Sequence, residues 1–217
     1  MRIAWMLVLI GMLFAGCAAT PHRASVDVYT NEPSRIQSSS ALLQAEGARS
    51  SDHVLIEIWM TALDKDADSA VGKEIGKDFG DLRPSRVDPV EFPELLNKTM
   101  DEHSAEVLVH LWLTVPLESS ADMTWEDAET GQTWQFQFAL EDMGKGNFQS
   151  TFSIRRVDAE KDVYREESLY ISGTSEYSHM SWSDSYAMAY PRNEKEWTVG
   201  LVELTRVSTL WRPEPEK

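Results

Sequence analysis

The most constraining feature of this chain is a segment that alternates strictly between large apolar and polar side chains. Along residues 134–140 one face carries Trp134, Phe136, Phe138 and Leu140, and the other carries Gln135 and Gln137. Side chains of a β-strand point alternately to opposite faces, so this pattern predicts a strand with one buried face. A strand of this kind needs a second layer over its apolar face, which predicts a sheet packed on another element.

The flanking segments extend this pattern into a mainly β fold. A turn at residues 143–147 joins the segment to a second alternating run at residues 148–157, which predicts a hairpin of about 25 residues. Further strands are expected at residues 54–60, 106–115, 163–172 and 197–210. Both faces of residues 106–115 are mostly apolar, so we expect this strand to be central.

One helix is expected before that strand, at residues 93–105. Pro93 suits the first turn and Glu94 lies at the positive end of the helix dipole. One side of the helix gathers Leu95, Leu96, Thr99, Met100 and His103. The predicted fold class is therefore mainly β or α+β, an antiparallel sheet or β-sandwich with one packed helix.

The N-terminus has the order of a secretory signal peptide. A positive Met1-Arg2 precedes an apolar run over residues 3–14, and Ala15-Gly16 then precedes Cys17. The run is shorter than the roughly 20 apolar residues of a membrane-spanning helix. Secretion with cleavage at another small residue is the alternative.

Residues 14–17, Phe-Ala-Gly-Cys, resemble the lipobox of bacterial lipoproteins, although Leu is usual where Phe14 stands. The resemblance implies that the Cys17 thiol takes the lipid and that Cys17 becomes the mature N-terminus. It also implies outer-membrane sorting, because Ala18 rather than Asp follows the anchor. The expected location is the cell envelope, on the periplasmic side of the outer membrane.

The chain divides into three predicted parts. Residues 1–16 are the signal peptide, residues 17–51 are a flexible tether rich in Ser, Pro, Asn and Gln, and residues 52–217 are a single β-rich domain. With Cys17 as the only cysteine, that domain has no intrachain disulfide.

Charge excludes one class of partner. The chain has 20 basic and 36 acidic residues, a net charge of −16. Such a surface repels nucleic acid and anionic headgroups, so we expect no nucleic-acid partner and a membrane link through the lipid alone.

A metal site is considered at Asp64, Asp66 and Asp68, which match alternate positions of a calcium loop. Ser69 replaces the glycine of the sharp turn, and Ile75 replaces the bidentate glutamate. A solvated acidic loop is therefore favoured, with no metal and no cofactor.

Catalytic motifs are not found: no G-x-S-x-G, S-x-x-K, P-loop or H-E-x-x-H pattern occurs. His103 is expected at the end of its helix, and His110 in a strand between Leu108 and Trp112. We therefore expect a noncatalytic protein, and an envelope hydrolase remains an alternative.

A binding surface is considered in residues 176–190, where small residues separate the aromatic side chains Tyr177, Trp182, Tyr186 and Tyr190. Aromatics spaced in this way can bind a glycan or another envelope protein. The competing interpretation is a strand and turn whose aromatic rings fill the core.

The order of elements after Val54 resembles the C-terminal β-domain of bacterial secretins. The similar parts are a helix at residues 94–104, a strand ending at Pro116, paired strands at residues 148–157 and 168–175, and a closing segment at residues 197–201. The N-terminal modules of secretins have no counterpart here. The resemblance implies a component of a secretion or pilus assembly as an alternative to a binding or assembly-supporting protein.

Overall fold

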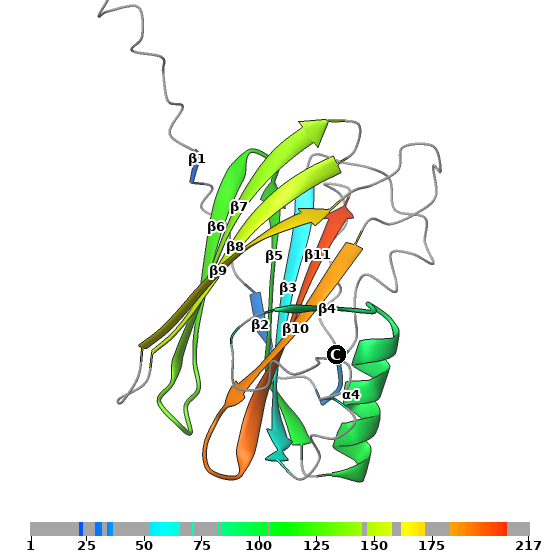
Figure 1. The fold of residues 1–217 in the computed structure, drawn as a ribbon, viewed down its shortest axis with the longest axis vertical. Helices are drawn as coiled ribbons and strands as arrows, with labels where there is room; N and C mark the ends of the chain where they lie inside the picture. The colour runs from blue at the N-terminus through cyan, green and yellow to red at the C-terminus, as the bar shows by residue number, and fades with distance from the viewer. Residues whose placement is uncertain are drawn as a thin grey trace, which may run out of the picture.

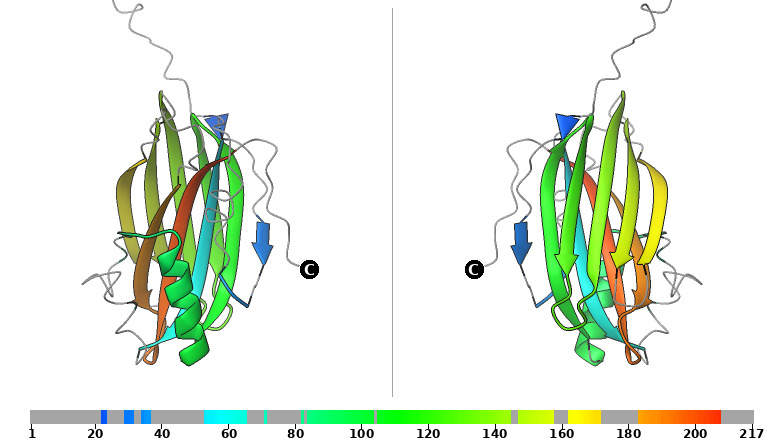
Figure 2. Two further views of the ribbon diagram at one scale, coloured as in Figure 1. Left: turned by 90° about the vertical axis from the view of Figure 1, so that its right-hand side faces the viewer. Right: turned by 90° about the vertical axis from the view of Figure 1, so that its left-hand side faces the viewer.

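The structure is a computed structural model. It describes residues 22–23, 29–31, 34–36, 53–65, 71, 82, 84–103, 105–144, 147–157, 162–171 and 183–207. Two sheets face each other and the helix α4 (Glu91–Glu102) covers the far face of one of them, as Figures 1 and 2 show. The fold is mainly β, as predicted.

The first layer, sheet A, has the strand order β1-β6-β7-β8-β9. Its strands are antiparallel except for β1, which pairs parallel to β6. Their bounds are His22–Arg23 for β1, Ser119–Glu126 for β6, Thr133–Gly144 for β7, Asn147–Val157 for β8 and Asp162–Ile171 for β9. The predicted hairpin is β7 and β8, with Phe138 opposite Phe152.

The second layer, sheet B, has the strand order β2-β5-β3-β11-β10-β4 and is antiparallel. Its bounds are Tyr29–Asn31 for β2, His53–Asp64 for β3, Ser85–Val87 for β4, Ala105–Pro116 for β5, Ser183–Pro191 for β10 and Glu196–Val207 for β11. The chain passes from β5 in sheet B to β6 in sheet A through Leu117 and Glu118, and Glu118 has a positive φ of 59°.

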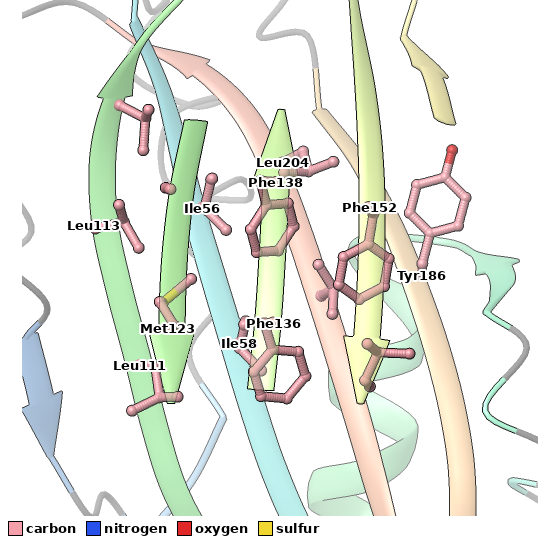
Figure 3. Close-up of a cluster of buried hydrophobic side chains, with 14 of the residues drawn as sticks. Ile56, Ile58, Leu111, Leu113, Met123, Phe136, Phe138, Phe152, Tyr186 and Leu204 are labelled. Carbon is pink, nitrogen blue, oxygen red and sulfur yellow. The ribbon is translucent and has the colours of Figure 1, made fainter. Parts of the chain in front are cut away.

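The core lies between the sheets (Figure 3). Phe136, Phe138 and Phe152 stack across β7 and β8, with ring centroids 4.9 Å apart for Phe138 and Phe152. From sheet B, Ile56 and Ile58 of β3 join the same cluster, together with residues of β5 and β11. The side chains that the alternating pattern assigned to the buried face, Trp134, Phe136, Phe138 and Leu140, are all at most 2% exposed.

A second cluster lies on the other face of sheet B, beneath α4. Phe92 and Leu96 of the helix pack with Trp59, Leu63 and neighbouring residues. The helix begins at Glu91, where the backbone N–H groups of Glu91 and Val90 donate hydrogen bonds to Asp88 Oδ1 and lower the pKa of that carboxyl group.

Two predictions about this region need correction. His103 does end the helix, but its side chain is exposed and does not join the buried side. The strand at residues 106–115 is not central, because β5 has only the three-residue β2 on its outer side. Both faces of β5 carry apolar side chains because one face joins the core between the sheets, while Ala105 and Val107 at the start of the strand join the cluster beneath α4.

The tether prediction also needs correction at its described residues. Residues 29–31 form a strand of sheet B, and Ile36 is only 3% exposed. These residues belong to the folded domain, although their polar composition favoured a tether.

We predict that Phe138→Ala lowers the free energy of unfolding by about 3–5 kcal/mol, because it opens a cavity where both sheets meet. The control is Gln137→Ala on the exposed face of the same strand, which we expect to change stability by less than about 0.5 kcal/mol. Urea unfolding of both variants measures this. Equal losses in the two variants would mean that the wrong face of β7 had been assigned to the core.

Candidate functional site

Four buried polar side chains form a row across the outer face of sheet B. Ser185 of β10, Glu203 of β11 and Glu57 of β3 occupy directly paired positions on adjacent strands. His110 of β5 completes this polar row next to Glu57. Ser185, Glu203 and Glu57 are 0% exposed and His110 is 6% exposed.

Two pairs of side chains in the polar row are in contact. His110 Nε2 lies 3.0 Å from Glu57 Oε1, and the His110 ring stacks on Trp59 at a centroid distance of 3.6 Å. The Ser185 hydroxyl donates to Glu203 Oε1 at 3.2 Å. The serine and the histidine are therefore bonded to different carboxylates. A serine activated by histidine needs that histidine within hydrogen-bond reach, whereas Ser185 here donates to Glu203, and both side chains are fully buried.

A second polar group, the ion cluster, joins the two sheets at one end of the sandwich. Arg192 lies in the turn between β10 and β11, and its side chain is 2% exposed. Its guanidinium group donates to both carboxylate oxygens of Asp127, at 2.8 and 3.2 Å, and Asp127 lies in the turn between β6 and β7. Glu129 and Glu196 accept from the same group at 2.7 and 2.9 Å.

The turn that carries Asp127 is fixed by its own hydrogen bonds. Gly131 has a φ of 68° and its N–H donates to the Asp127 carbonyl, while Gln132 Nε2 reaches the Arg192 carbonyl at 2.7 Å. A side chain at Gly131 would be strained, since the left-handed region favours glycine. The turn with Asp127 is therefore fixed in shape and is tied to the turn that carries Arg192.

Burial alone would raise the pKa of Asp127. Hydrogen bonds from Arg192, from the Glu129 N–H group and from the Thr130 side chain outweigh that effect, so the net pKa lies below its ordinary value. The same ion pair raises the pKa of Arg192. The Asp127–Arg192 pair thus stays charged over the whole neutral range.

The aromatic segment is placed differently from the predicted binding surface. Tyr186 and Tyr190 are 8% and 5% exposed and belong to the core between the sheets. The surface prediction is wrong for these two residues, because β10 points them inward and turns Ala187 and Ala189 toward α4. Tyr177 and Trp182 lie outside the described residues.

Other predicted sites fall partly outside the described chain. Asp64 ends β3, whereas Asp66 and Asp68 lie outside the described residues, as does Cys17. Among the described residues, no group of three His, Cys, Asp or Glu side chains could hold a metal ion. No described helix has the length and apolar character needed to span a membrane.

Sequence reasoning missed both polar groups. The available signal was an isolated acid inside an apolar strand, as at Glu57 and Glu203. The pairing of Asp127 with Arg192 has no sequence signal, because 65 residues separate them. Comparison of the chain with protein-family models, curated proteins and solved structures finds no match.

We predict that Asp127→Ala costs about 3 kcal/mol of stability at neutral pH, since it leaves a buried arginine with fewer partners. The matched control is Glu129→Ala. It removes a carboxylate from the same arginine, but this side chain is 66% exposed, so we expect about 0–1 kcal/mol. Equal losses of stability in Asp127→Ala and Glu129→Ala would contradict the conclusion that the buried Asp127–Arg192 pair holds the two sheets together.

The Asp127 contribution also predicts a direction with pH. Its folded pKa is lowered, so the stabilisation is complete above its ordinary value of 3.8 and is lost as pH falls through the folded pKa. The stability difference between wild type and Asp127→Ala should therefore shrink on acidification below that value. Denaturant unfolding across this range measures it.

Proposed function

We propose that the protein is a lipid-anchored envelope protein, tied to the outer membrane through Cys17, whose β-rich domain binds or supports a partner without catalysis. The anchor is supported by the order of positive start, apolar run and small residues before the only cysteine. No basic patch is needed in this arrangement, which suits the net charge of −16.

The observation that carries the noncatalytic part is the placement of the reactive side chains. Ser185 and His110 are buried and each is bonded to a different glutamate. Arg192 is likewise buried and is bonded to three carboxylates. These groups hold the fold together, and a hydrolase would need them to reach a substrate.

The surface best suited to a partner is the outer face of sheet A, which faces the viewer in the right panel of Figure 2. No described element crosses this face. Cross-strand rows of polar side chains cover it, with Asp122 beside Gln137 and Thr124 beside Gln135. Arg155 continues the second row. Among the residues whose side-chain burial is described, a set that leaves out those of β9, large exposed apolar side chains are limited to Val90 and Met143. We therefore expect a polar, hydrogen-bonded interface with a partner that tolerates negative charge.

We expect the protein, expressed in a bacterial host with labelled fatty acid, to carry the label and to sediment with membranes. Cys17→Ser should lose both properties, because the thiol that takes the lipid is gone. Label and membrane association that persist unchanged in Cys17→Ser would refute the anchor.

The same envelope preparation tests the binding face after chemical crosslinking. Asp122→Lys on sheet A should reduce the crosslinked species, whereas Glu194→Lys, the same charge change in the exposed turn between β10 and β11, should not. Identical crosslinking in both variants would remove sheet A as the partner surface.

A further inference from the structure

The described N-terminal residues contact every layer of the domain. Strand β1 pairs with β6 of sheet A, with His22 opposite Ser119. Strand β2 then pairs with β5 of sheet B, with Asn31 opposite His110, along the edge shown in Figure 2. Residues 34–36 finally lie against α4.

The contact with α4 has the features of peptide recognition. The side chain of Asn97 accepts a hydrogen bond from the Ile36 N–H and donates one to the Ile36 carbonyl, both at 2.9 Å. Arg35 binds both oxygens of Asp101, at 2.7 and 2.9 Å. The Ile36 side chain enters the apolar cluster beneath the helix and is 3% exposed. The Asn97 amide, the Asp101 carboxylate and the apolar cluster beneath α4 therefore bind two successive residues, Arg35 and Ile36.

This docking is weaker than the pairing inside the sheets. Strands β1 and β2 pair over two and three residues, whereas β3 and β11 pair over twelve. The Arg35 and Asp101 side chains are 56% and 58% exposed, so water and salt screen their attraction. Ordering the segment also costs backbone entropy. Segments with these properties open locally before the rest of a domain unfolds.

We propose that α4 and the edge of β5 form a docking site for the chain's own residues 29–31 and 34–36, and that release of these residues lengthens the membrane anchor. The second half of this statement rests on the proposed lipid at Cys17. His22 is five residues after Cys17, which allows at most about 18 Å between the lipid and the docked domain. His53 is 36 residues after Cys17, so full release allows up to about 130 Å.

Asn97 is the residue of α4 that holds the docked segment by its backbone. It satisfies both backbone groups of Ile36, while β1 and β2 are held by short backbone pairing. Without the two Asn97 hydrogen bonds, only the short pairing of β1 and β2 and the contacts of Arg35 and Ile36 hold the segment, so we expect it to open more often. The two lengths of the anchor would let one domain work close to the bilayer or reach away from it.

Hydrogen exchange of the purified full protein in detergent tests the docking. In Asn97→Ala the amides of Tyr29–Asn31 and Ile36 should exchange at least about tenfold faster, which corresponds to about 1.4 kcal/mol of docking free energy. Amides of β7 and β8 should not change. The control is Lys98→Ala, the neighbouring exposed residue of α4, which should behave as wild type. Added salt should speed exchange in the wild type but not in Asp101→Asn.

Wild-type exchange at Ile36 that occurs only with global unfolding would overturn the proposal, as would identical behaviour of Asn97→Ala and Lys98→Ala.

The anchor length has its own readout, energy transfer from a dye on Met143→Cys to an acceptor lipid in vesicles. Met143 lies at the β1 end of the sandwich, where Asp142 N–H donates to Glu118. Transfer should fall in Asn97→Ala, and unchanged transfer would overturn the length change. Failure of lipidation at Cys17 would remove the membrane role while leaving the exchange result to decide the docking.

Discussion

The packing of sheet A against sheet B is the interaction on which the other features depend. Phe136, Phe138 and Phe152 form a stacked layer on one sheet, and the aliphatic side chains of β3 and β5 cover it from the other. Burial of an aromatic side chain contributes about 1.5–3 kcal/mol, so this layer provides much of the stability that a chain with a single cysteine cannot obtain from disulfides. The second face of sheet B packs against α4. The outer face of sheet A is then the surface that contacts water or a partner.

The buried polar groups fix how the strands and the two sheets are aligned within this packing. Arg192 and Asp127 bring together two turns from different sheets, and neither charge could stay buried without the other. In the polar row, Glu57 and Glu203 occupy opposite positions on β3 and β11. A register slip of one residue would turn the slipped strand's glutamate into the apolar core between the sheets, which would be costly. We interpret both groups as determinants of register and sheet alignment.

The sequence predicted the parts of the fold that depend on local periodicity. Strands β3, β5, β7, β8, β9 and β11 and the helix were expected close to their observed bounds. Strands β1, β2, β4 and β6 were not predicted, because the first three have only two or three residues and Ser, Asp and Thr dilute the pattern of β6. Residues 176–190, which include most of β10, were left open between a binding surface and a strand with its turn. Tyr186 and Tyr190 were considered for a binding surface because small residues separate the aromatic side chains. For these two residues the structure shows the competing interpretation, a strand whose rings fill the core. Long-range pairs such as Asn97 with Ile36 leave no periodic signal, so the docking of the N-terminal segment could be seen only in three dimensions.

The central claim is that the two sheets form one cooperative unit through their shared core. Native-state hydrogen exchange of β8 in sheet A and β11 in sheet B, measured with increasing urea, tests it directly. The account predicts that the slowest amides of both strands converge on one opening free energy, equal to that of global unfolding. Opening of β8 at a clearly lower free energy, while β11 stays protected, would show that the sheets are stable separately and would contradict it.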